Sequence, residues 1–305
     1  MMNRLYTIII SALLPLSAAG QALPFTAADY NPATMAMGGS YAVETSSTAY
    51  SAFGNISAAP FSSNKMDVAA GYTLWEPSAL KTNVINAAGA GKIGKNMAVA
   101  AGFSYGLNPE YEIFDSYGMA AGTFKPSQMR ISAGFAWKFL PFLSIGANLG
   151  YASSKLADNA SYGAFIADVF LMSRIKDFKI ALGTSGLGTS VTSASGDKFS
   201  LPSSIEIGGG FEHVYGKSHG IDARVQAEYY FSGAIAASAG LAYNFNNLVS
   251  IRAGYRFGGK SVIPSYASIG AGLELFGIHL DAAYLIAQKD SPTANTLSIS
   301  LGYRF

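Results

Sequence analysis

The sequence has no cysteine, few charged side chains and no long hydrophobic run. The absence of cysteine excludes disulfides, zinc–thiolate sites and cysteine nucleophiles. No stretch supplies the roughly 18 consecutive apolar residues that a transmembrane helix needs. Charged residues make up only 12% of the chain, which is about half the share found in soluble domains. Because 50% of the residues are hydrophobic, much of the surface must face something other than water.

The net charge of +2 gives no reason to expect a nucleic-acid partner. The N-terminus has the three parts of a secretory signal peptide: Arg4 supplies the positive charge, residues 7–19 form a short apolar run, and small residues precede Gln21. The apolar run is too short to span a bilayer as a helix. We therefore expect residues 1–21 to be a signal peptide that is removed after export.

From Met66 onward, apolar and polar residues alternate with a period of two. In residues 297–305, Leu, Ile, Leu, Tyr and Phe share one face, whereas Ser, Ser, Gly and Arg share the other. Such alternation is typical of β-strands, because successive side chains point to opposite faces. About fourteen segments of this kind begin near Met66, Asn83, Met97, Met129, Phe142, Tyr162, Phe178, Ser204, Ile221, Ala234, Leu248, Tyr266, Ile278 and Thr296.

The links between these segments alternate between short and long. The long ones include residues 153–161 and, longest of all, 107–127. Short periplasmic turns and longer external loops are typical of bacterial outer-membrane barrels. An unpaired sheet edge is not tolerated in lipid, so the strands must close on themselves. We predict an all-β fold: a transmembrane antiparallel β-barrel of about 14 strands, formed by residues 65–305.

This prediction places the protein in the outer membrane of a Gram-negative bacterium, with outer-membrane lipid as its first partner. Aromatic residues gather near the segment ends, as in the interfacial girdles of such barrels. Tyr303 and Phe305 end the last segment. We expect them to form the C-terminal assembly signal of the barrel.

The polar face of the predicted strands carries charges of both signs. We expect these side chains to face the lumen and to pair across neighbouring strands. A ring of one sign, which would indicate ion selectivity, is not present. The predicted lumen-facing charges are Arg130, Glu206, Arg224, Glu228, Arg252, Arg256, Glu274, Asp281 and Arg304.

Residues 22–64 lack the alternation and are rich in Ala, Ser, Gly and Pro. They could form a flexible periplasmic tail or a plug inside the barrel. The lumen of a barrel of about fourteen strands is wider than side chains alone can fill, which gives a plug a physical purpose. We therefore predict a plug segment at 22–64.

Four residues of this segment carry a resemblance to a known family. Met37, Gly38 and Gly39, followed by Asn55, resemble the N-terminal pattern of the PorV/PorQ family, whose members are outer-membrane proteins related in fold to the FadL fatty-acid transporters. Ile56 stands where that family has proline. The resemblance implies a fourteen-stranded barrel with an N-terminal plug that contains these four residues.

The resemblance leaves two functions open. The PorV/PorQ relationship implies a non-enzymatic component associated with type IX protein secretion or outer-membrane assembly, with secretion-machinery or secreted proteins as partners. The FadL relationship implies a channel for the uptake of hydrophobic small molecules. A pocket reached from outside would favour the channel, whereas a filled lumen would favour the secretion component.

Few residues could support catalysis. His279 and Asp281 share one strand face, and the neighbouring segment offers Ser298 and Ser300, but a Ser–His–Asp triad requires a geometry that spacing alone does not supply. No His pair has the spacing of a metal site. The glycine-rich residues 89–95 precede another strand rather than a helix, so they predict a turn and not a phosphate-binding loop. We predict no enzymatic activity, no metal and no cofactor.

Overall fold

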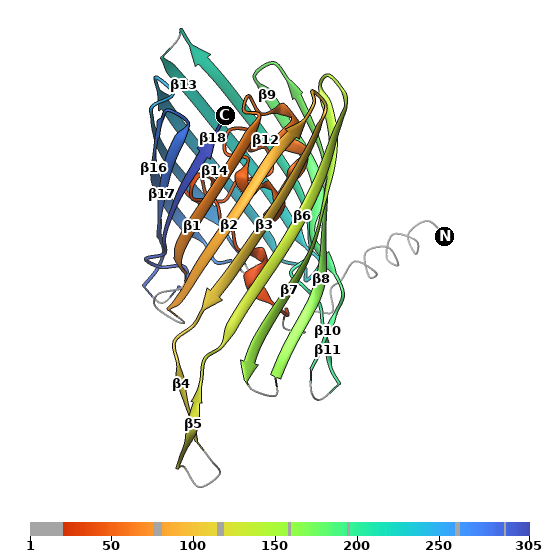
Figure 1. The fold of residues 1–305 in the computed structure, drawn as a ribbon, viewed down its shortest axis with the longest axis vertical. Coiled ribbons are helices and arrows are strands. Elements are labelled where there is room, and N and C mark those ends of the chain that lie inside the picture. Colours follow the sequence, from red (N-terminus) through yellow and green to blue (C-terminus); the bar gives the residue numbers. More distant parts are fainter. Residues whose placement is uncertain are drawn as a thin grey trace, which may run out of the picture.

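The structure is a computed structural model. It describes residues 21–305 except 76–80, 115–118, 158–159, 194–195, 217, 260–262 and 290. The predicted signal peptide lies outside the described residues, apart from Gln21. Fourteen antiparallel strands close into one barrel (Figure 1). The wall strands are β1 (Met66–Trp75), β2 (Thr82–Ile93), β3 (Met97–Leu107), β6 (Ser127–Leu140), β7 (Leu143–Ala157), β8 (Ala160–Ile175), β9 (Phe178–Gly188), β12 (Ser204–Tyr215), β13 (His219–Tyr230), β14 (Ile235–Phe245), β15 (Val249–Phe257), β16 (Tyr266–Leu275), β17 (Ile278–Ile286) and β18 (Leu297–Arg304).

The sequence prediction of the barrel is confirmed. Each wall strand begins within two residues of its predicted start, and each pairs with the strand next to it along the barrel. The first and last strands close the wall, with Val68 opposite Tyr303. The turn between β2 and β3 is formed by residues 94–96, whereas residues 89–93 of the glycine-rich stretch belong to β2.

One predicted link is wrong. Residues 153–161 were expected to form a long external loop, but β7 and β8 continue through most of them, with Ser153 opposite Gly163 and Lys155 opposite Ser161. The stretch from Ser153 to Ser161 is mostly polar, so the strands extend through it although the alternation of apolar and polar residues fades. The longest predicted link, 107–127, contains a small hairpin of its own, β4 (Tyr111–Phe114) and β5 (Ala120–Phe124).

The two ends of the barrel differ. The C-terminus and the short turns lie at one end, here called the turn end, which is at the top of Figure 1. The opposite end, here called the loop end, carries the longer links. These include the projecting β4–β5 hairpin and the short β10 (Val191–Thr192) and β11 (Lys198–Phe199) pair.

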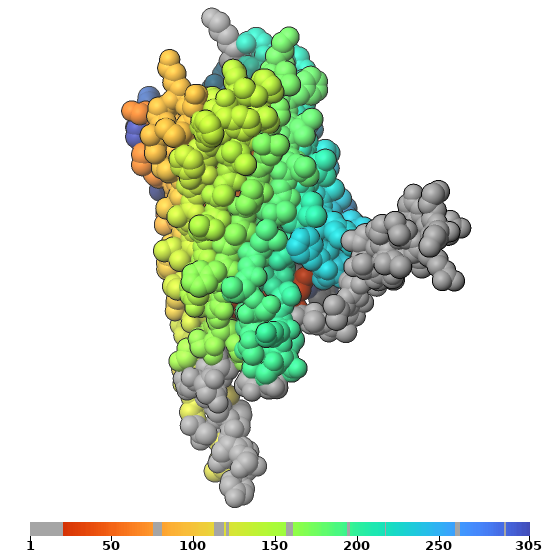
Figure 2. Space-filling model, turned by 90° about the vertical axis from the view of Figure 1, so that its right-hand side faces the viewer, coloured from red at the N-terminus to blue at the C-terminus, as the bar shows by residue number. Residues whose placement is uncertain are grey.

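The outer face of the wall is apolar. Leu149 is 69% exposed, and Phe135 and Trp137 on β6 are about half exposed, at 50% and 51%. Figure 2 shows the strands of the middle of the chain as one continuous outer surface. Among the described residues, no helix is long and apolar enough to cross a membrane. Because the outward positions of the wall are hydrophobic, the chain carries only a small share of charged residues.

The last residue completes the closure of the wall. The carbonyl oxygen of Phe305 accepts hydrogen bonds from the backbone N–H groups of Lys65 (2.6 Å) and Met66 (2.9 Å), and its own N–H donates to Met66 at 3.0 Å. The side chains of Tyr303 and Phe305 are 46% and 56% exposed. Their role as an assembly signal stays a prediction.

Residues 21–64, here called the luminal segment, lie inside the barrel (red to orange in Figure 1). The segment contains four short helices, which are η1 (Pro24–Ala27), α2 (Pro32–Met35), η2 (Ala49–Phe53) and η3 (Ile56–Phe61). Most of its residues are buried, and Met35 and Met37 are each only 1% exposed. The segment occupies the space that the wall side chains cannot reach.

Candidate functional site

The Met37–Gly38 backbone rests directly on glycines of the wall. A Cβ atom added at Gly254 of β15 would lie 2.3 Å from Gly38 N, and one added at Gly240 of β14 would lie 2.4 Å from Met37 Cβ. Gly38 itself has a φ of +72°, which favours glycine, and its N–H donates to Ser268 Oγ at 3.0 Å. Glycine on both sides allows the two backbones to touch.

Asn55, the fourth residue of the resemblance, joins two parts of the luminal segment. Its side-chain oxygen accepts a hydrogen bond from Ser57 N at 2.8 Å and so caps η3. Its Nδ2 donates to the carbonyl of Ala42 at 2.6 Å. Ile56, which stands where the PorV/PorQ family has proline, is only 1% exposed. The motif residues therefore shape the luminal segment and seat it against the wall.

The structure places the nine predicted charges inside the barrel, either deep in the lumen or at its turn end. Most pairs skip a strand instead of joining neighbours. Arg252 on β15 contacts Asp281 on β17 at 2.7 Å, and a Cβ added at Gly272 on the strand between would lie 2.6 Å from that carboxylate. A small residue on the middle strand lets the long arginine reach across. The other such pairs are Arg130–Asp168 at 3.5 Å, Arg256–Glu228 at 2.6 Å and Arg304–Glu274 at 3.2 Å.

Arg224 differs, because it joins the wall to the luminal segment. Its NH1 contacts Glu44 Oε2 at 2.6 Å, and its other donors contact Asp222 on the same strand. Both Arg224 and Glu44 are buried. Burial raises the pKa of the Glu44 carboxyl, but the Arg224 guanidinium outweighs it and holds that pKa below its ordinary value. Glu44 is therefore a carboxylate at neutral pH.

Residues 44–47 border two cavities within the lumen. A cavity of about 70 Å³ on the loop-end side is lined by Glu44 and Ser47. A cavity of about 270 Å³ on the turn-end side is lined by Ser46. Residues 44–47, here called the septum, therefore contribute to the lining of both the loop-end cavity and the turn-end cavity.

The septum is held by polar contacts. Besides the Glu44–Arg224 ion pair, Arg304 NH1 donates to Ser46 O at 3.2 Å and Asn31 Nδ2 donates to Ser47 O at 3.3 Å. Thr45 Oγ1 donates to a wall carboxylate at 3.2 Å. Contacts of this kind can exchange with water, which makes the septum easier to displace than an apolar core of the same size.

His279 does not form the Ser–His–Asp arrangement considered from the sequence. Its Nδ1 lies 3.2 Å from Asp281 Oδ2 and its Nε2 lies 3.0 Å from Asp67 Oδ1, so carboxylates occupy both ring nitrogens. Ser298 Oγ bonds instead to Thr73 at 2.7 Å. Within the described part of the chain, no group of three or more metal-ligating side chains could hold a metal ion.

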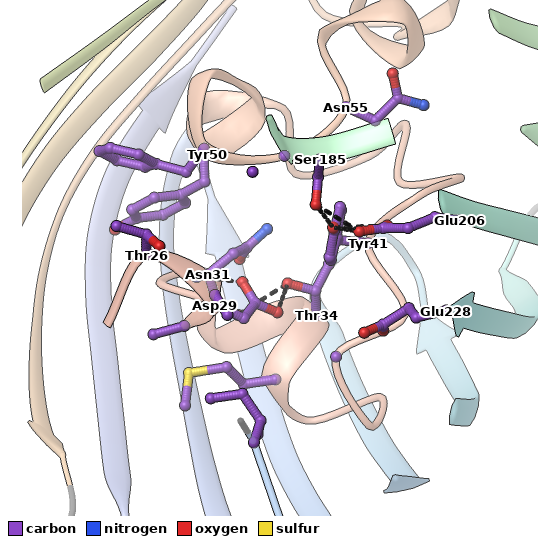
Figure 3. Close-up of a pocket in the computed structure, with 18 of the residues that line it drawn as sticks. Thr26, Asp29, Asn31, Thr34, Tyr41, Tyr50, Asn55, Ser185, Glu206 and Glu228 are labelled. Atoms are coloured by element: carbon purple, nitrogen blue, oxygen red, sulfur yellow. Dashed lines mark hydrogen bonds between the residues drawn. The ribbon is translucent and has the colours of Figure 1, made fainter. Parts of the chain in front are cut away.

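The loop-end cavity is polar on one side and aromatic on the other. Figure 3 shows Asp29 and Thr34 of the luminal segment facing Glu206 and Glu228 of the wall. Both oxygens of Glu206 accept from the Tyr41 hydroxyl at 2.6 Å. The opposite side is formed by Met35, Tyr50, Phe53, Trp75 and Tyr266.

Sequence reasoning missed Asp29 and Glu44, although a signal was present. They are the only acidic residues in an otherwise uncharged stretch from 22 to 64. A buried segment rarely retains a charge without a partner or a role. Two isolated carboxyl groups in this segment therefore pointed to specific contacts in the lumen.

The Asp29 carboxyl gives a pH-dependent prediction. Burial raises its pKa to about 6, even though Thr34, the backbone N–H of Asn31 and Arg256 each favour the ionised form. A carboxyl whose pKa is higher in the folded than in the unfolded chain costs stability when it must ionise. This cost is absent below about pH 4 and complete above about pH 6, and it amounts to about 3 kcal/mol at about 1.4 kcal/mol for each pKa unit.

We therefore expect Asp29→Asn to gain stability relative to the wild type by about 3 kcal/mol as the pH rises from 4 to 7. The measurement is the urea midpoint of luminal-segment release, followed by the fluorescence of Trp75. A difference between variant and wild type that stays constant with pH would contradict the assignment.

The architecture defines a class of protein. A closed antiparallel barrel of fourteen strands with an apolar outer face has the fold of solved bacterial transport channels.

Three solved structures illustrate the likeness. The Ralstonia pickettii toluene transporter TbuX has a TM-score of 0.63 at 11% identity, covering 90% of this chain and 98% of that one. The Pseudomonas putida toluene transporter TodX has a TM-score of 0.63 at 12% identity, covering 89% of this chain and 97% of that one. A Pseudomonas aeruginosa FadL homologue has a TM-score of 0.54 at 10% identity, covering 90% of this chain and 98% of that one. No protein-family model and no curated protein sequence matches the chain.

At these identities the likeness concerns the fold alone. It confirms the coarser part of the expected resemblance, a barrel of the FadL type. The PorV/PorQ assignment stays a prediction.

Proposed function

We propose that this protein is an outer-membrane channel for small molecules in which the luminal segment acts as a movable plug. The fold likeness to transport channels supports this function over the secretion component. The titles of those neighbours name toluene transporters, which makes a small molecule with an apolar part the substrate class to consider first. The same fold likeness and the apolar outer face of the wall support localisation in the outer membrane, with lipid around the barrel.

The septum carries the proposal. Two cavities already lie within the lumen, and residues 44–47 line both of them. Movement of this short stretch would join the cavities into a path from the loop end to the turn end. Because polar contacts hold the septum, its opening costs less than the unfolding of the wall, whose strands are paired along their length.

The experiment compares conductance with unfolding in urea. Purified protein in planar bilayers bathed in potassium chloride is expected to be closed for most of the time, with brief openings. Urea weakens contacts that involve peptide groups, so it should open the channel reversibly at concentrations that leave the β-barrel intact by circular dichroism. A bilayer that stays non-conducting until the barrel itself unfolds would contradict the proposal.

A second candidate is the PorV/PorQ-type role in protein secretion or outer-membrane assembly. Two observations favour it: the seating of Met37 and Gly38 on the wall, and the β4–β5 hairpin, which projects beyond the loop end and exposes Tyr111 (Figure 1). Crosslinking in outer membranes tests this role. Recovery of secretion-machinery proteins, with loss of that crosslink on removal of residues 109–125, would favour it over the channel.

A further inference from the structure

Two carboxyl groups of the loop-end cavity lack a basic partner. The other carboxyl groups that line either cavity each have a basic side chain within 4.0 Å, as Glu228 has Arg256 and Asp168 has Arg130. Among the residues that the structure describes, Asp29 and Glu206 have none. This cavity therefore holds negative charge that the chain itself does not balance.

Neutral donors surround the two groups. Glu206 accepts from the Tyr41 hydroxyl at 2.6 Å, from Ser185 Oγ at 2.6 Å and from Gln226 Nε2 at 3.1 Å. Asp29 accepts from Thr34 Oγ1 at 2.6 Å and from the backbone N–H of Asn31 at 2.9 Å. Such hydrogen bonds orient a carboxylate, but they do not supply the opposite charge that a buried carboxylate needs.

The rest of the cavity offers a surface for an apolar cation. Tyr50, Phe53, Trp75 and Tyr266 contribute aromatic rings, and the faces of aromatic rings attract ammonium groups. Arg256 also lines the cavity, but its charge is taken by Glu228 at 2.6 Å. The Tyr50 hydroxyl, on a side chain that is 5% exposed, has no hydrogen-bond partner in the described structure. A hydroxyl oxygen can accept a hydrogen bond from an ammonium group.

We propose that the loop-end cavity binds a small organic cation, an alkylammonium compound whose charge lies between Asp29 and Glu206 and whose apolar body lies against the aromatic side. This assignment rests on the proposed channel function and names its substrate class. The cavity of about 70 Å³ is about half the volume of one that holds benzene, so the cation is small. An ammonium group supplies the positive charge that these two carboxylates lack.

The test uses three small probes: ethylammonium as the cation, ethanol as the neutral compound and acetate as the anion. Trp75 lines the cavity and the chain has only two tryptophans, so Trp137→Phe leaves Trp75 as the single reporter. We expect ethylammonium to bind at least tenfold more tightly than ethanol, and acetate to bind more weakly than either.

Glu206→Gln and Asp29→Asn should each weaken ethylammonium binding at least tenfold and leave ethanol binding unchanged. Asp177→Asn is the matched control, since Asp177 pairs with His213 away from the cavity. This variant should change neither the binding of the cation nor that of the alcohol. The amide oxygen that Glu206→Gln introduces can still accept from the Tyr41 hydroxyl, and a melting curve for each variant checks the fold.

Equal binding of cation and alcohol, binding of no probe, or no effect of either variant would overturn the assignment. Equal binding would indicate that the two carboxyl groups are neutralised by protons instead. The urea conductance experiment reports on the plug alone. A channel that opens in urea but shows no preference for the cation therefore loses only the substrate class, whereas a channel that never opens loses the proposed function.

Discussion

Replacing Gly254 by leucine is expected to displace the luminal segment and leave the channel open. Even a single Cβ at this position would lie 2.3 Å from Gly38 N and from Met37 C. Backbone atoms of the segment cannot turn away as a flexible side chain could, so the segment must move. Overpacking of this kind destabilises the packed state by about 1–3 kcal/mol or more. Displacement of the luminal segment from the wall relieves the clash. The expected readouts are a steady conductance in potassium chloride and protease cleavage within residues 36–48.

Gly209 provides the matched control for this variant. It lies in strand β12, and a Cβ added there meets only Val225 Cγ2 at 3.5 Å, which is ordinary van der Waals contact. Gly209→Leu should therefore remain closed and resistant to protease. A Gly254→Leu protein with the same closed state would show that the luminal segment is not seated on the wall glycines.

Replacing Arg224 by glutamine is expected to open the septum. The change leaves Glu44 without a cation within 4.0 Å and removes the closest partner of Asp222. Breaking a buried ion pair from one side costs about 3–5 kcal/mol, because an uncompensated charge stays behind. The septum can avoid this cost by moving Glu44 into water, so the open fraction in planar bilayers should rise by a factor of about 100 or more, on the order expected for that energy.

The double variant Glu44→Gln with Arg224→Gln tests whether the unpaired charge of Glu44 is what opens the septum. It removes both charges of the pair, and Lys179 Nζ still lies 3.6 Å from Asp222. Most of the closed state should return, since no charge is left unpaired across the septum. If the double variant is as open as Arg224→Gln alone, the ion pair is not what holds residues 44–47 in place.

The wall could be predicted from the sequence because lipid outside and water inside impose opposite demands on alternate residues. Val249 to Phe257, for example, places apolar residues on one face and Ser250, Arg252 and Arg256 on the other. The structure pairs the whole stretch with β14 and all of it except Phe257 with β16. The prediction failed at residues 153–161, where the residues are mostly polar and the strands pair without alternation.

The lumen could be predicted only in part. The identities of its charges followed from the polar face, but their partners did not, because an arginine reaches a strand two positions away only when the strand between is small there, as at Gly272. The luminal segment has no periodicity, and its position depends on glycines such as Gly240 and Gly254, which lie more than 200 residues further along the chain. No local sequence pattern predicts that contact.

The most direct test of the movable plug is a disulfide that ties the luminal segment to the wall beside the septum. Because the chain has no cysteine, Ala42→Cys with Gly208→Cys would create only the intended bond. A Cβ added at Gly208 lies 2.8 Å from Ala42 Cβ, so a small shift brings the pair to the roughly 3.5–4.5 Å that a disulfide requires. Conductance in urea should vanish in the oxidised protein and return on reduction. An oxidised protein that conducts as well as the reduced one would contradict the account.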